Sequence, residues 1–179
     1  MYIDTNLYSG RPEQRRSERE ERVYDVLDSL GIEYKRIDHD ATASISECEN
    51  IDKLLGIRIC KNLFLCNSQK SSFYLLMMPG DKPFKTKDLS HQIGSSRLSF
   101  APPEYMEKYL GLSPGSVSIM GLVNDAEKRV KLLIDREVLK AEYIGCHPCV
   151  NTSSLKIKTE DITGKFIAYT GHFLTEVVL

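Results

Sequence analysis

The segments "KNLFLCN" (residues 61–67) and "SFYLLMM" (residues 72–78) decide the fold, because both are short apolar runs that contain aromatic side chains. Only the polar tetrapeptide "SQKS" (residues 68–71) separates them. Two such runs around a polar turn are typical of a β-hairpin, and apolar residues without strict alternation indicate a sheet that is covered on both faces. The sequence therefore predicts β-structure at the centre of the molecule.

Two helices and a strand are predicted on the N-terminal side of this hairpin. Ser17 and Glu20 form an S-x-x-E capping box ahead of apolar residues at helical spacing, and Gly31 ends the segment. The next segment, "IEYKRIDH" (residues 32–39), has the pattern of an extended strand. The S-x-x-E pattern recurs at residues 46–49, which predicts a second, short helix before the hairpin.

The C-terminal side mixes helices and strands. Thr86 can cap a short helix over residues 87–93, while Pro102 and Pro103 can open another over residues 104–110. Four further segments have the composition of strands. They are "SVSIMGLV" (116–123), "RVKLLID" (129–135), "SSLKIK" (153–158) and "FIAYT" (166–170). Because the elements follow no regular βαβ alternation, we expect an α+β domain with a mixed central β-sheet and surrounding helices.

Length and charge restrict the possible functions. A chain of 179 residues suffices for one well-buried core, so we expect one domain over residues 17–179 after a charged N-terminal arm over residues 1–16. With 24 basic and 25 acidic residues, the chain lacks the global basic field that drives sequence-independent nucleic-acid binding. The sequence has no membrane-length apolar run and no apolar core of a secretory signal, which predicts a cytoplasmic protein without membrane contact.

The segment "YIGCHPCVNTSSLKI" (residues 143–157) contains a C-x-x-C pair, Cys146 and Cys149, and allows two interpretations. A redox or zinc centre is one of them, but zinc needs four ligands and the other cysteines form no second pair. The alternative is a tight loop shaped by Gly145 and Pro148, in which the cysteines pack as small apolar side chains. The second interpretation is favoured, so no metal and no other cofactor is predicted.

Three blocks of the sequence together resemble a known family. The blocks "CKNLFLCN" (60–67), "LSPGSVSIMGLVND" (112–125) and "GCHPCVNTSSLKI" (145–157) are similar in order and spacing to the prolyl-tRNA editing-domain family. That family includes the ProX (ProXp-ala type) and YbaK proteins and the insertion domain of bacterial prolyl-tRNA synthetases. The resemblance extends from about Arg22 to about Ile162 and implies the fold of that family, with a mixed, partly barrel-like sheet.

The resemblance implies an aminoacyl-tRNA deacylase that removes alanine wrongly attached to proline tRNA. A synthetase pocket built for proline cannot exclude the smaller alanine, because one or two missing methylenes give only about 1–3 kcal/mol of discrimination. The expected partners are aminoacylated proline tRNA and prolyl-tRNA synthetase. Two alternatives stay open: a YbaK-like deacylase for cysteine on proline tRNA, and a non-catalytic module that senses aminoacyl-tRNA.

The resemblance also assigns the site residues. The lysine of the family falls on Lys61, and the histidine of its glycine–histidine–proline loop falls on His147. Lys61, His147 and the backbone of Gly145 are the expected catalytic groups, because loop N–H groups can receive an oxyanion. No G-x-S-x-G nucleophile elbow is present, which favours attack by water. The expected substrate-binding residues are Asn62, Thr42, Ser118, Pro148 and Asn151.

Overall fold

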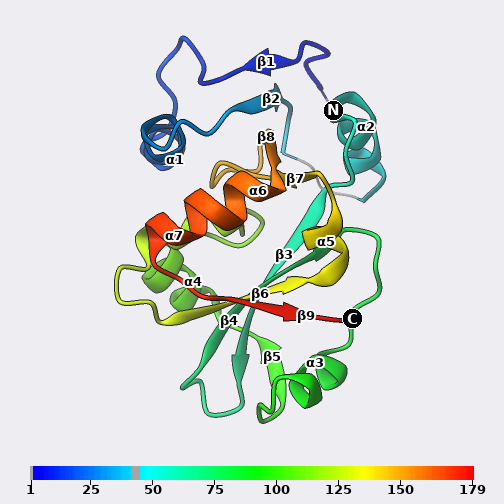
Figure 1. The fold of residues 1–179 in the computed structure, drawn as a ribbon, viewed down its shortest axis with the longest axis vertical. Coiled ribbons are helices and arrows are strands. Elements are labelled where there is room, and N and C mark those ends of the chain that lie inside the picture. Colours follow the sequence, from blue (N-terminus) through cyan, green and yellow to red (C-terminus); the bar gives the residue numbers. More distant parts are fainter. Residues whose placement is uncertain (1, 42–44) are drawn as a thin grey trace.

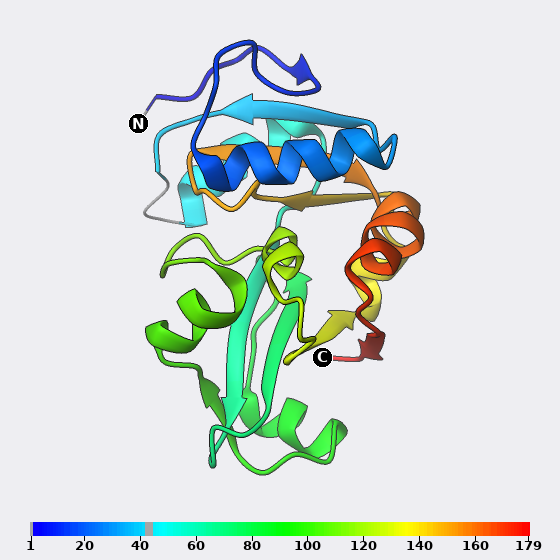
Figure 2. The same cartoon turned by 90° about the vertical axis from the view of Figure 1, so that its left-hand side faces the viewer.

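The computed structural model describes residues 2–41 and 45–179 and contains two β-sheets (Figure 1). One sheet has four antiparallel strands in the order β1-β2-β8-β7. These strands are β1 (Tyr8–Ser9), β2 (Tyr34–Asp38), β8 (Ser153–Lys158) and β7 (Tyr143–Cys146). In Figure 2 this sheet lies across the upper half of the molecule, with α1 beside it.

The second sheet has five strands in the order β5-β3-β4-β6-β9 and is mixed. The strand β3 runs antiparallel to both β4 and β5, whereas β6 runs parallel to both β4 and β9. The strands are β5 (Leu98–Phe100), β3 (Cys60–Asn67), β4 (Phe73–Pro79), β6 (Val130–Asp135) and β9 (Leu174–Val177). The mixed sheet confirms the predicted fold class, although the β-structure is divided between two sheets.

The predicted hairpin is β3–β4, and the side chains of its two strands alternate between two cores because successive strand residues point to opposite faces. One set, which includes Phe64, Phe73 and Leu75, packs into the main core between the two sheets. The other set, which includes Leu65 and Leu76, packs toward α3 (Thr86–Gln92). Both faces of the hairpin are therefore covered, as its continuous apolar composition predicts.

Helices complete the layers around the sheets. The capping box of Ser17 and Glu20 starts α1 as predicted, and the buried side of this helix packs into the main core. On the opposite face of the four-stranded sheet, α2 packs its Ile51 and Leu55 on Ile37. The helices not yet bounded are α1 (Glu18–Ser29), α2 (Ile45–Leu55), α4 (Pro103–Leu110), η1 (Ile119–Asn124), α5 (Arg136–Lys140), α6 (Thr159–Asp161), η2 (Ile162–Phe166) and α7 (Ile167–Thr170). Within the described ranges, no helix combines the length and the apolar character needed to cross a membrane.

Two predicted strands are wrong. Residues 116–123 contain η1 instead, because the hydroxyl of Ser118 accepts a hydrogen bond from the N–H of Met120 and caps a helical turn. Residues 166–170 belong to η2 and α7, where Phe166 and Ile167 are buried against the main core. The predicted cap at Thr86 is also wrong, since α3 begins at Thr86 and its N-cap residue is Lys85.

The second S-x-x-E pattern marks a helix, but its register is shifted. The helix α2 already begins at Ile45, so Ser46 lies within the helix and is not its N-cap. The first residues of the chain also gain a pairing that the sequence does not reveal, because β1 adds to the edge of β2.

Gly145 is a position of close approach between the two sheets. It forms a parallel bridge with Ile59, just before β3 begins. A Cβ atom on Gly145 would lie 2.7 Å from Cδ1 of Ile57 and 3.3 Å from the backbone Cα of Ile59. An added Cβ would therefore force the side chain of Ile57 to move and the backbone of Ile59 to give by a few tenths of an ångström.

We expect Gly145→Ala to lower the free energy of unfolding by about 1–3 kcal/mol, the usual cost of overpacking a tight interior. Gly164→Ala is the matched control, because no atom lies within 4 Å of its added Cβ. That change lies in a helical segment and should raise stability by about 0.5–1 kcal/mol. Chemical denaturation of the three proteins measures both effects, and equal stability of the two variants would contradict the close approach at Gly145.

Candidate functional site

A cavity of about 500 Å³ opens where the start of β3 meets α2 and the loop that follows β7. The loop after β7 is far from α2 and β3 in the sequence, and the bridge between Ile59 and Gly145 brings it next to the start of β3. The cavity contains three of the eight predicted site residues: Lys61, Asn62 and His147. The other residues that line it are Glu49, Asp52, Arg58, Ile59, Cys60, Gly80, Asp81, Gly115 and Val117.

Lys61 is the half-buried cation of this cavity. The strand β3 holds it opposite Met78 of β4, and its Nζ donates a hydrogen bond to the backbone carbonyl of Lys82. Burial lowers the pKa of Lys61, whereas the negative charge of Asp81 raises it. One hydrogen bond uses only one of the three donors of an ammonium group, so Lys61 is oriented and can still donate to a ligand.

His147 is held in one tautomer by its surroundings. Its Nδ1 lies 2.9 Å from the carbonyl oxygen of Ser153, and because a carbonyl can only accept, Nδ1 carries the hydrogen. Burial is the largest influence on the pKa of His147 and lowers it; the bond to Ser153 opposes this shift and His39 adds to it. The ring is therefore neutral at neutral pH, and its Nε2 carries a lone pair that no described residue hydrogen-bonds.

Ser118 fixes the loop that carries His147. Its hydroxyl donates a 2.6 Å hydrogen bond to the backbone carbonyl of His147 and accepts one from the N–H of Met120. The side chain of Ser118 is fully buried. Ser118 therefore holds the backbone of the loop from behind the cavity and does not belong to the described residues that line it.

The remaining predicted residues lie beside the cavity or outside the description. Gly145 and Pro148 are buried in and next to β7, and neither belongs to the set of described residues that line the cavity. Nδ2 of Asn151 lies 3.7 Å from the point where a Cβ of Gly115 would be, which places Asn151 just behind the cavity wall. Thr42 lies outside the described residues.

The acidic residues of the cavity are not evident from the sequence. Asp52 of α2 is the most unusual, because its Oδ1 is buried and has no hydrogen-bond partner among the described residues. Burial raises the pKa of Asp52, the backbone N–H of Ile59 opposes this shift, and the charges of Asp81 and Glu49 add to it. No local pattern around Asp52 indicates a site, since only the packing of α2 near β3 brings it to the cavity.

Arg58 and Asp81 form the rim opposite α2. Nε of Arg58 donates a 2.7 Å hydrogen bond to Asp81, and a second guanidinium nitrogen lies 3.1 Å from Glu137. The hydrogen bond from Arg58 lowers the pKa of Asp81, and hydrogen bonds from Lys82 and then from Arg58 lower the pKa of Glu137. The pairs are solvent-exposed, so they order the rim and contribute little to stability.

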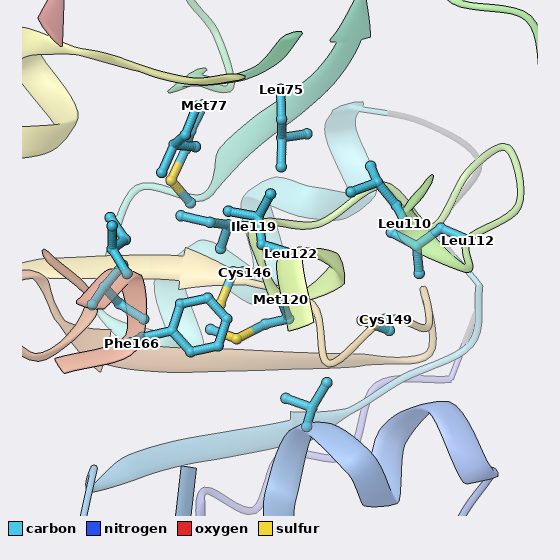
Figure 3. Close-up of a cluster of buried hydrophobic side chains, with 14 of the residues drawn as sticks. Leu75, Met77, Leu110, Leu112, Ile119, Met120, Leu122, Cys146, Cys149 and Phe166 are labelled. Carbon is cyan, nitrogen blue, oxygen red and sulfur yellow. The ribbon is translucent and has the colours of Figure 1, made fainter. Parts of the chain in front are cut away.

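The cysteines of the C-x-x-C pair are buried in the main core (Figure 3). Both are free thiols, and Figure 3 shows Cys146 among Met120, Phe166 and other apolar side chains. Burial raises the pKa of Cys146 strongly and raises that of Cys149 to about 12, so both thiols are protonated at neutral pH. Protonated thiols are poor nucleophiles and poor metal ligands. Within the described part of the chain, no three His, Cys, Asp or Glu residues cluster as metal ligands would.

Comparison with known proteins identifies the class to which this fold and cavity belong. The family described as the aminoacyl-tRNA editing domain matches residues 39–164. This range contains Lys61, Asn62 and His147, the three predicted residues that line the cavity. The chain therefore belongs to the aminoacyl-tRNA editing-domain family.

Particular relatives support this assignment. The prolyl-tRNA editing protein ProX of Acetoanaerobium sticklandii is 35% identical over 136 residues, which cover 76% of this chain and 83% of that protein. Prolyl-tRNA synthetase associated domain-containing protein 1 of Danio rerio is 30% identical over 158 residues, which cover 87% of this chain and 83% of that protein. A crystal structure of a candidate trans-editing enzyme for prolyl tRNA synthetase has the same fold, with a TM-score of 0.67 and 17% identity over 92% of this chain and 99% of that one.

We expect the double variant Cys146→Ser, Cys149→Ser to fold and to retain most of the activity of the wild-type protein. Each hydroxyl enters an apolar site, so thermal stability should fall, but neither thiol lines the cavity. Hydrolysis rates and melting temperatures of the two proteins check this expectation, together with elemental analysis of the wild type. A stoichiometric metal ion, or loss of activity in a folded variant, would show that the thiols have a chemical role.

Proposed function

We propose that this protein is a deacylase that hydrolyses alanine from wrongly charged proline tRNA. The observation that carries the proposal is the meeting of Lys61 with a neutral, oriented His147 at one cavity of an editing-domain protein. The name of the 35% identical relative, prolyl-tRNA editing protein ProX, supports proline tRNA as the substrate. Prolyl-tRNA synthetase is the proposed source of the wrongly charged tRNA.

In this proposal a water molecule attacks the ester carbonyl, because the described residues that line the cavity include no serine and the buried thiols are protonated. The ammonium group of Lys61 orients the terminal ribose and ester oxygens. The free lone pair on Nε2 of His147 can accept a hydrogen bond from the attacking water or from a ribose hydroxyl. Backbone N–H groups of the loop around His147 stabilise the developing oxyanion.

The terminal adenosine contributes its own 2′-hydroxyl in this mechanism. It lies next to the ester in every aminoacyl-tRNA, so binding that fixes the ribose also fixes a hydroxyl that can place the water. The protein then needs only to orient the substrate and to stabilise charge. The pair of Lys61 and His147 is suited to both tasks.

A panel of charged proline tRNAs tests the substrate. We expect the alanyl ester to be cleaved fastest and the prolyl ester to be spared, with cysteinyl and seryl esters as intermediate cases. Alanine and cysteine differ by a single sulfur atom, so fastest cleavage of the cysteinyl ester would instead favour the YbaK-like activity. Binding without cleavage of any ester would favour a sensing module, and equal rates for all esters would overturn editing.

We expect Lys61→Ala to reduce the rate of hydrolysis on the order of a hundredfold, the usual effect of removing one donor that stabilises developing charge. The melting temperature should change little, because a half-buried lysine contributes little to folding. Lys156→Ala is a matched control. Lys156 is also a half-buried strand lysine, and its Nζ donates a 2.9 Å hydrogen bond to the carbonyl of Leu55, but it lies outside the cavity.

Rate and melting temperature are measured for both lysine variants. If Lys61→Ala unfolds early and keeps its specific activity, Lys61 is a structural residue. If Lys156→Ala loses as much activity as Lys61→Ala, the effect does not depend on the cavity.

Alanyl-tRNA that ends in 2′-deoxyadenosine tests the role of the ribose hydroxyl. We expect its single-turnover hydrolysis to slow far more than its binding weakens, because the hydroxyl acts mainly in the transition state. Undiminished cleavage of the deoxy substrate would mean that the protein places the water itself. His147→Ala would then be expected to abolish activity with both substrates.

A further inference from the structure

A second groove, of about 630 Å³, adjoins the candidate site and shares Lys61 with it. The groove lies on the face of the five-stranded sheet that carries α3, next to the start of that helix. Its lining is unusual in composition. Three lysines, Lys61, Lys85 and Lys87, surround three apolar side chains, Leu63, Phe84 and Phe100.

The strand register explains why an aromatic ring is exposed here. Phe100 is the last residue of the edge strand β5 and pairs with Leu65 of β3, so it shares a face with Leu63 and Lys61. Farther along this face, Leu65 and Leu98 are buried against α3. Phe100 lies beyond that cover and is 62% exposed.

The charge of the groove contrasts with that of the candidate site. The lining of the groove contains three lysines and no carboxylate among the described residues. The cavity of the candidate site contains the cations Lys61 and Arg58, but also the carboxylates of Glu49, Asp52 and Asp81. A surface of lysines around an exposed aromatic ring is the pattern that binds single-stranded nucleic acid, because the lysines contact phosphates and the ring stacks on a base.

We propose that this groove binds the unpaired nucleotides that precede the terminal adenosine of the tRNA. The inference rests on the proposed function, since the ester must lie in the adjoining cavity at Lys61. In this arrangement the ring of Phe100 stacks on one of the two preceding bases. Lys85 and Lys87, both exposed, contact the phosphates of the same strand. The groove thus guides the 3′ end past Lys61 without reading its sequence.

The test measures binding of uncharged proline tRNA, so its result does not depend on deacylation. Three forms of the tRNA are compared: the intact molecule and two molecules that lack the base, but keep the phosphate, at either position before the terminal adenosine. For the wild type, removal of the stacked base should weaken binding about tenfold. In Phe100→Ala that loss should disappear, because the stacking partner is already absent. In Phe100→Trp, removal of the stacked base should again weaken binding.

Phe173→Ala is the matched control, because Phe173 is 91% exposed and lies outside the groove. It should keep the wild-type response to both abasic tRNAs. Should Phe100→Ala not fold, Phe100→Leu retains the apolar packing and removes only the ring. A wild type that is insensitive to both missing bases, or a folded Phe100 variant that responds as the wild type does, would overturn the proposal and leave the exposed ring to a protein partner.

The lysines have a separate readout. Replacing Lys85 and Lys87 together with alanine should reduce the slope of log affinity against log salt concentration by about 1.4, about 0.7 for each phosphate contact to a single strand, because fewer counterions are released on binding. The control pair Lys70→Ala, Lys140→Ala changes the net charge equally, at exposed positions outside the groove. An equal loss of slope in both pairs would show that only the total charge matters, and would overturn the assignment of the phosphates to this groove.

Discussion

The candidate site depends on one close approach, that of Gly145 in β7 to Ile59 just before β3. The two sheets otherwise contact each other through the side chains of the main core. Direct backbone proximity at this point fixes the start of β3 next to the loop that carries His147. The absence of a side chain at Gly145 therefore determines the distance between the two halves of the site.

Charge is distributed unevenly around this junction. The cavity combines Lys61 and Arg58 with three carboxylates, and Asp52 has a raised pKa because burial outweighs the opposing hydrogen bond from the N–H of Ile59. Compared with a lining of lysines alone, such a mixed environment is less favourable to phosphate and can accept a group with positive charge. The aminoacyl group of a charged tRNA carries a free ammonium group, and no phosphate lies on its side of the terminal ribose. The polyanionic part of a tRNA is better accommodated outside, where lysines without carboxylates line the adjoining groove.

The sequence predicts those parts of the molecule that local chemistry determines. The hairpin β3–β4 is evident because its apolar runs are continuous, and α1 because its capping box is complete. Residues 116–123 are predicted as a strand although they contain η1, because Ser118, which caps η1, is equally compatible with a strand. The edge strand β9 is missed because Thr175 and Glu176 are exposed and give it no apolar pattern. Of the site, resemblance identifies Lys61, Asn62 and His147, whereas Asp52 and Asp81 reach the cavity only through tertiary packing.

The division of the site between two sheets also concerns its dynamics. Lys61 belongs to the five-stranded sheet, and His147 follows a strand of the four-stranded sheet. Any fluctuation that separates the sheets moves these two residues apart, even if each sheet keeps its own hydrogen bonds. The site therefore has no independent local stability. Its lifetime cannot exceed that of the interface between the sheets, and slow amide exchange within one sheet alone would not show that the site is formed.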